Sequence, residues 1–178
     1  SSNVYMTFGK SSAWADESNP PQANTSVSAF NEIWKNMIGA KRVTGNDVEL
    51  VVPRVNWTSN TKYRQYDDTI QINDLLTSNA TQNLKPMYVI TSDRNVYKCL
   101  SNSASANSTV EPTGDYTTSN GNISTADGYV WKYMYTISPA DVIKFVSTDF
   151  IPVKTLTSNP GSTDAYYDQW LVQDGAVD

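Results

Sequence analysis

The chain has 178 residues, an apolar fraction of 39% and a formal net charge of −5, and it contains no histidine. A chain of this length can bury a sizeable core without a disulfide or a metal. The acidic balance and the scattered basic residues argue against binding to nucleic acid or to an anionic membrane. Histidine, the missing residue type, is the commonest general base and the commonest metal ligand in proteins. We expect one mostly-β domain over residues 1–178, with no cofactor, no metal site and no small-molecule substrate.

The candidate catalytic residues are few. Cys99 is the only cysteine and lies in an apolar run, which is typical of a small buried hydrophobe, and no histidine is present to activate it. Adjacent carboxylates such as Asp67 and Asp68 would point to opposite faces of a strand, whereas a glycosidase needs two that converge across a cleft. No apolar run reaches the ~20 residues of a membrane span, and no signal peptide is visible. We expect no enzyme and no membrane protein.

The spacing of apolar side chains changes from strand-like to helical near residue 25. Residues 3–9 alternate apolar and polar side chains, which predicts a strand, and residues 10–26 predict a long surface loop that Trp14 pins down. From about residue 25 to 39 the apolar spacing is helical, with Asn24, Thr25 or Ser26 as the cap and Gly39 at the end. We expect the apolar stripe of this helix to pack on a sheet; a partner-binding face is the alternative. The stripe contains Val27, Phe30, Ile33, Trp34, Met37 and Ile38.

The remaining chain predicts short strands and one short helix. Turn-forming residues join two apolar runs into a hairpin over residues 87–100, and a long polar loop follows over residues 101–125. Ser138 and Pro139 start a second helix over about residues 139–147. Further strands are predicted over residues 47–57, 69–74, 149–154 and 170–173. The fold class is mainly β and sandwich-like, with two helices.

The stretch ADGYVWKYMYTI, residues 126–137, contains the most distinctive pattern. Alternate residues of a strand share a face, so its large side chains form an aromatic ladder. The opposite face is the more polar one, which favours a ladder that points inward as core or subunit interface. The alternative is a platform on which a sugar or a base stacks. The ladder consists of Tyr129, Trp131, Tyr133, Tyr135 and Ile137.

Several segments resemble, in the same order, those of one protein family. They are VYMTFGKSSAW, SVSAFNEIWKNMIGAKRV, VVPRVNW, VYKCLSN, STVEPTG, ADGYVWKYMYTI and FIPVK. The family is the gene product eight baseplate wedge subunit of T-even-like, contractile-tailed bacteriophages. Phages that infect marine bacteria, including cyanophages, have Ser/Asn/Thr-rich versions that match this composition.

The resemblance implies a non-catalytic structural protein in the tail baseplate of the virion, assembled in the host cytoplasm. It implies a β-sandwich with helical subdomains, a homodimer within each wedge and contacts with other wedge proteins. The T-even member is considerably longer at both ends. The resemblance therefore implies either a minimal version of the wedge subunit or an ordered fragment of a longer one.

A protein held between neighbours needs aromatic anchors and loops that wrap its partners. The candidates for such contacts lie in the two long loops and near the end of the chain. They are Trp14, Tyr116, Ile123, Tyr166, Tyr167 and Trp170. Local packing is the alternative for each of them. The competing function is a carbohydrate-binding or receptor-binding tail module that uses the aromatic strand Tyr129–Ile137.

Overall fold

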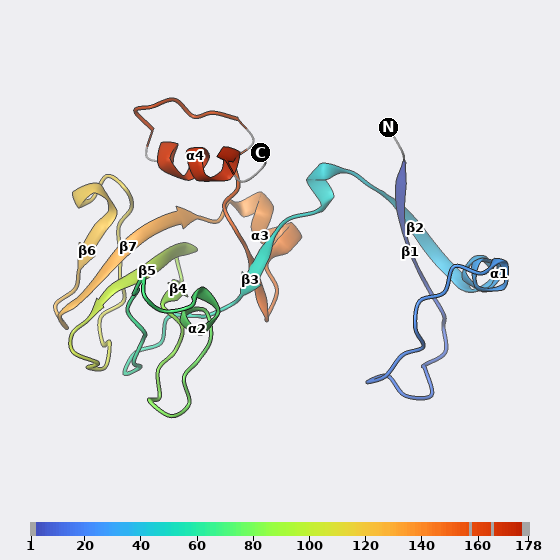
Figure 1. Ribbon diagram of the computed structural model, residues 1–178, viewed down its shortest axis with the longest axis horizontal. Helices are drawn as coiled ribbons and strands as arrows, with labels where there is room; N and C mark the ends of the chain where they lie inside the picture. Colours follow the sequence, from blue (N-terminus) through green and yellow to red (C-terminus); the bar gives the residue numbers. More distant parts are fainter. Residues whose placement is uncertain (1–2, 157, 165, 176–178) are drawn as a thin grey trace. The chain divides into compact units, whose positions relative to one another are not determined.

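The computed structural model describes residues 3–156, 158–164 and 166–175 (Figure 1). Contacts gather the chain into two compact units, Ser1–Glu49 and Leu50–Asp178, called here the N-terminal and C-terminal units. Each unit has strands and helices of its own. The single domain expected over residues 1–178 stays a prediction.

The N-terminal unit is a two-stranded antiparallel ribbon with one α-helix between its strands in the chain. The strand predicted over residues 3–9 is confirmed as β1. The strand β2, which is not among the predicted elements, pairs antiparallel with it and places Gly39 opposite Phe8. An added Cβ at position 39 would lie 2.6 Å from the Phe8 ring, so the ring packs directly over this glycine. The elements are β1 (Val4–Gly9), α1 (Val27–Asn36), β2 (Met37–Val43) and the 3-10 helix η1 (Gly45–Asp47).

Helix α1 begins where its capping chemistry predicts and ends earlier than its apolar spacing predicts. The Ser26 hydroxyl accepts a hydrogen bond from the Ala29 amide at 3.2 Å, so Ser26 is the cap. The helix ends at Asn36 because Met37 is already extended, with φ −67° and ψ 122°. The predicted end at about residue 39 is wrong. Gly39 lies in β2, where pairing with β1 provides hydrogen-bond partners for the backbone groups of this segment.

The C-terminal unit is built on a four-stranded antiparallel sheet in the order β4-β5-β7-β6. The predicted hairpin is confirmed, with a turn in which Arg94 has φ +65°. The predicted aromatic strand is also confirmed and lies between β5 and β6. Part of the predicted long loop is regular structure, since β5 continues into it and a 3-10 helix precedes β6. The elements are β4 (Tyr88–Ile90), β5 (Asn95–Asn102), η2 (Ser119–Gly121), β6 (Asn122–Ser124) and β7 (Tyr129–Thr136).

A second, smaller sheet packs with α3 against one face of the main sheet. β3 (Val51–Pro53) pairs antiparallel with β8 (Phe150–Pro152), and α3 covers Pro139–Phe145. The predicted second helix is confirmed, since the Ser138 hydroxyl accepts from the Asp141 amide at 3.1 Å. The fold is mainly β, as predicted, and this layering of sheet on sheet is sandwich-like.

Two predicted strands are helices instead. Residues 69–74 form a turn followed by α2 (Ile72–Leu75), because the Asp67 carboxylate accepts from the Thr69 amide at 2.9 Å and turns the chain before the helix. Residues 170–173 lie in α4 (Tyr167–Gly175), where the Trp170 amide donates to the Tyr166 carbonyl at 2.9 Å. Both apolar runs are short enough to fit the period of a strand or of a helix, so local hydrogen bonds decide which of the two forms.

The main sheet has a hydrophobic cluster on each face. The first cluster contains the buried residues Tyr63, Val89, Tyr97, Cys99, Ile123, Tyr129 and Trp131. The second contains Leu75, Met87, Tyr88, Ile90, Val96, Ile137 and Ile151. The chain between β3 and α2 covers the first cluster through Tyr63, and the small sheet covers the second through Ile151.

Candidate interaction surfaces

Cys99 and the acidic side chains are the groups that the sequence offers for catalysis or metal binding. No group of three or more His, Cys, Asp or Glu side chains among them could hold a metal ion. Burial raises the pKa of the Cys99 thiol to about 12, so the thiol is protonated at neutral pH and is a poor nucleophile. Nor, among these residues, does any helix have the length and apolar character needed to cross a membrane.

The centre of the aromatic ladder is inside the protein. Tyr129 and Trp131 are both 0% exposed, and their rings stack with centroids 5.4 Å apart. Tyr63 meets the Trp131 ring edge-on, with centroids 5.5 Å apart. The Tyr129 hydroxyl donates to the Ala106 carbonyl at 2.6 Å. Neither Tyr129 nor Trp131 can stack on a ligand in this structure, because neither ring has exposed surface.

A bulge in β7 divides the ladder between the two faces of the sheet. Val96 pairs with Tyr135 and the next residue, Tyr97, pairs with Tyr133, so Met134 is an extra residue in β7. An extra residue shifts the alternation of the strand by one position. Tyr133 therefore packs on the first cluster and Tyr135 on the second. The expectation of one continuous ladder on one face is wrong beyond Tyr133.

Asp127, which is not among the predicted site residues, ties the loop before β6 to the start of β7. Its carboxylate accepts from the amides of Thr109 and Val110 at 2.7 and 2.9 Å and from the amide of Tyr129 at 3.2 Å. Thr125 adds a hydroxyl donor. Partial burial acts to raise the pKa of Asp127, but the hydrogen bonds outweigh it and lower the pKa to about 2. Asp127 is thus a structural clasp.

The predicted contact residues are placed at very different depths. Trp14 and Tyr116 are 41% and 44% exposed, and Lys10 Nζ lies 3.6 Å from the centre of the Trp14 ring. Ile123 is buried in the first cluster and offers no surface. Trp14 belongs to the N-terminal unit, and Tyr116 and Ile123 belong to the C-terminal unit.

The three aromatic candidates near α4 are half-buried. Burial raises the pKa of Tyr166 to about 12, with a further contribution from the neighbouring Tyr133 hydroxyl. Lys154 Nζ lies 5.7 Å from the Tyr166 ring. Tyr166 thus packs against the main sheet, while Tyr167 and Trp170 lie on α4 itself.

The N-terminal unit exposes most of its apolar side chains. Among its described residues, 3–49, none is buried, so the expected packing of the α1 stripe into a core is not found. Val4, Met6 and Phe8 of β1 are 57–59% exposed. Trp34 of α1 is also exposed. Apolar surface of this kind on a soluble protein is typical of an interaction site.

The ribbon and α1 share an apolar groove of about 470 Å³. Tyr5 and Thr7 of β1 and Ala40 of β2 form one wall. Side chains of the helix form the other wall, namely Phe30, Ile33 and Trp34. Because alternate residues of β1 face opposite ways, Val4, Met6 and Phe8 lie on the other face of the ribbon, away from this groove.

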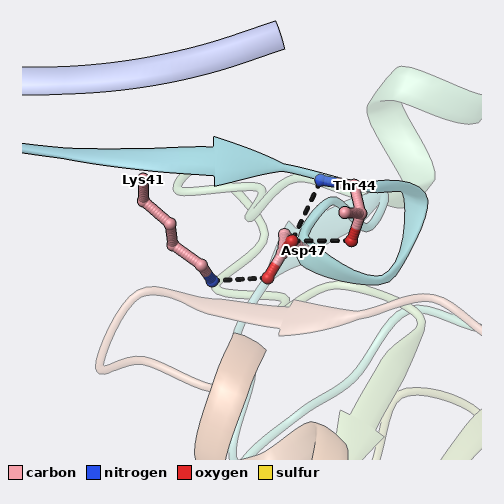
Figure 2. A network of polar contacts seen from close by, with 3 residues as sticks. All are labelled: Lys41, Thr44 and Asp47. Carbon is pink, nitrogen blue, oxygen red and sulfur yellow. Dashed lines mark hydrogen bonds and ion pairs between the residues drawn. The ribbon is translucent and has the colours of Figure 1, made fainter. Parts of the chain in front are cut away.

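A polar network follows β2 (Figure 2). Lys41 forms an ion pair with Asp47, and the Thr44 amide and hydroxyl donate to the same carboxylate at 3.0 and 2.7 Å. The hydrogen bond from Lys41 is the main cause that holds the pKa of Asp47 well below its usual range. The network shapes the turn at η1. β1, with the sequence VYMTFG, contains no charged side chain.

The sequence matches the family model described as "Bacteriophage T4, Gp8" over residues 1–103 and 100–160. The chain belongs to this Gp8 family. The baseplate wedge protein gp8 of Enterobacteria phage T4 is 27% identical over 183 residues, which cover 84% of this chain and 52% of that protein. The chain thus spans about half the length of this curated relative. The resemblance stated from the sequence motifs is confirmed.

The Gp8-like motifs have structural roles in this chain. In VVPRVNW, Arg54 donates to the Ser147 carbonyl at 3.0 Å and Trp57 donates to the Ser108 hydroxyl at 3.1 Å. In ADGYVW, Asp127 is the clasp described above and Trp131 is the centre of a core cluster. The signal that could have found Asp127 is its Asp-Gly turn directly before a strand.

Proposed function

We propose that this chain is a structural subunit of a contractile-tail baseplate, located in the virion, that contacts neighbouring wedge proteins and a second copy of itself. Membership of the Gp8 family supports this proposal, since the relative from phage T4 is a baseplate wedge protein.

The observation that carries the proposal is the exposed apolar surface of the N-terminal unit. Interfaces of permanent complexes resemble a core cut in half, and such surface is stable in water only when a partner covers it. β1 and α1 each expose large apolar side chains, including Met6 and Trp34. Trp14 and Tyr116 are exposed aromatic anchors for neighbouring subunits, whereas Ile123 acts inside the subunit.

Mass spectrometry of purified virions from the source phage tests the proposal. The chain should be a stoichiometric component of the particle, at a pair of copies in each wedge. Its absence from purified tails would contradict the structural role. Fractionation of the virion preparation on a density gradient provides the control. The chain should be found in the fractions that contain tails, whereas a contaminant would not follow those fractions.

Trp14→Ala tests the contact role of the long N-terminal loop. We expect a folded protein, by circular dichroism, that is no longer incorporated into virions when it is supplied to phage lacking the wild-type chain. Ile143→Ala is the matched control, because Ile143 is an exposed apolar residue of α3 outside the proposed contacts. Loss of folding in Trp14→Ala would instead assign Trp14 to local packing.

A further inference from the structure

The ribbon of the N-terminal unit lacks what a stable sheet needs. Among the described residues of this unit, 3–49, its sheet consists of β1 and β2. A two-stranded ribbon is marginally stable in water, and three or more strands with a covered face are needed for independent stability. α1 contributes to one face through the groove, yet no described residue of the unit is buried. A further strand at one edge would supply the missing backbone partners.

The two edges of the ribbon differ in charge. β2 contains the adjacent cations Lys41 and Arg42, and charged side chains, lysine above all, are a common protection of an edge strand against pairing. β1 has the sequence VYMTFG, with no charge and no proline. Its outer edge is therefore the one suited to strand addition.

We propose that β1 pairs antiparallel with β1 of a second copy of this chain, across a two-fold axis at Met6. This deepens the self-contact proposed above and rests on it. The resulting sheet has the order β2-β1-β1-β2, with the cationic strands outermost. Pairing through β2 would instead place the cation Arg42 of each copy at the new junction between the two ribbons, where like charges repel.

The register follows from the side chains of β1. An axis at Met6 places Met6 opposite its own copy, Val4 opposite Phe8, and Tyr5 opposite Thr7. Every apolar side chain of the face that contains Val4, Met6 and Phe8 then has an apolar partner across the axis. A shift of the axis to Tyr5 or Thr7 leaves part of this apolar set without a partner in the second strand. In this register β1 is therefore complementary to β1 of a second copy, and no other sequence is needed to form the pair.

The first test is the substitution Met6→Glu in the full chain, with Met6→Gln as the uncharged control. Within one ribbon Met6 is the partner of Lys41, so the introduced carboxylate faces a cation and the ribbon is retained. Across the proposed axis two carboxylates oppose each other. We expect the dimer dissociation constant to rise roughly tenfold or more in Met6→Glu, measured by sedimentation, and to recover in high salt.

The second test traps the register directly. Met6→Cys should form a disulfide-linked dimer under mild oxidation, because opposite residues of paired strands are within disulfide reach. Val4→Cys should not, since the axis places the two copies of residue 4 about four positions, or ~13 Å, apart. The double variant Val4→Cys/Phe8→Cys should form the dimer. The buried Cys99 does not compete.

The outcomes separate this inference from the proposed function. A wild-type chain that stays monomeric at high concentration overturns it. So does a dimer that Met6→Glu leaves unchanged, or a Met6→Cys variant that does not cross-link while the protein is dimeric. If the chain is nevertheless a stoichiometric part of the virion, the baseplate role stands and another surface makes the contact. A dimer that Met6→Glu disrupts, together with a chain absent from virions, supports the pairing and contradicts the baseplate role.

Discussion

The strands β1 and β7 have similar patterns and opposite environments. Both alternate large apolar or aromatic side chains with smaller or more polar ones, yet Trp131 of β7 is 0% exposed whereas Met6 of β1 is 57% exposed. β7 lies between two other strands and has packed side chains on both faces, while among the described strands β1 pairs with β2 alone. The alternation determines which side chains share a face, and the covering layers determine whether that face is buried.

The largest expected effect that sharpens this comparison comes from Trp131→Ala. The substitution removes the ring that contacts both Tyr63 and Tyr129, and a cavity in a core of this kind costs about 3–5 kcal/mol of unfolding free energy. Urea unfolding followed by circular dichroism measures the loss. Trp34→Ala in the exposed stripe of α1 is the matched control, with about 0.5 kcal/mol or less expected in the isolated chain. Equal losses in the two variants would contradict the contrast between the units.

The next effect concerns the clasp at Asp127. Asp127→Asn removes the charge that accepts from the Thr109 and Val110 amides, at an expected cost of about 1–3 kcal/mol. Asp68→Asn, at an exposed position in the same unit, is the control and should be close to neutral.

The clasp also predicts a pH dependence. Because the folded pKa of Asp127 is lowered to about 2, below the ordinary value of 3.8, its contribution is fully present above pH 4. The contribution falls as the pH drops from about 4 to about 2, and the difference in unfolding free energy between wild type and Asp127→Asn should shrink over the same range. A difference that stays constant down to pH 2 would show that the carboxylate charge is not what holds the loop.

The smallest expected effect lies in the ribbon. Gly39→Ala brings a methyl group within 2.6 Å of the Phe8 ring, but this ring is largely exposed and can swing away, so we expect a cost below about 1 kcal/mol. Amide hydrogen exchange of β1 and β2 measures it. Gly45→Ala is the control, because an added Cβ there meets no atom within 4 Å. A cost as large as that of Trp131→Ala would mean that the ribbon is already tightly packed.

Several local features could be predicted because the residues that cause them are neighbours in the chain. Ser26 and Ser138 cap their helices through residues three positions on, and the turn before β5 uses residues that favour turns. The sequence predicts a strand over residues 170–173 because a four-residue apolar run fits both periods, and the hydrogen bond that the Tyr166 carbonyl accepts from the Trp170 amide decides for a helix. The Asp-Gly turn marks Asp127 in the sequence, but its partners Thr109 and Val110 lie 18 and 17 residues away, so spacing alone could not identify them.

By itself, the sequence determined the mainly-β class, the two capped helices, the aromatic strand and the family, because these follow from local hydrogen bonding, side-chain alternation and motif order. Only the tertiary structure decided that Met37 begins a strand, that the extra Met134 moves Tyr135 to the other face, and that β1 and α1 stay exposed. These features depend on which distant segments pair with a strand and which segments cover its faces. The alternation of side chains within a single strand reveals neither.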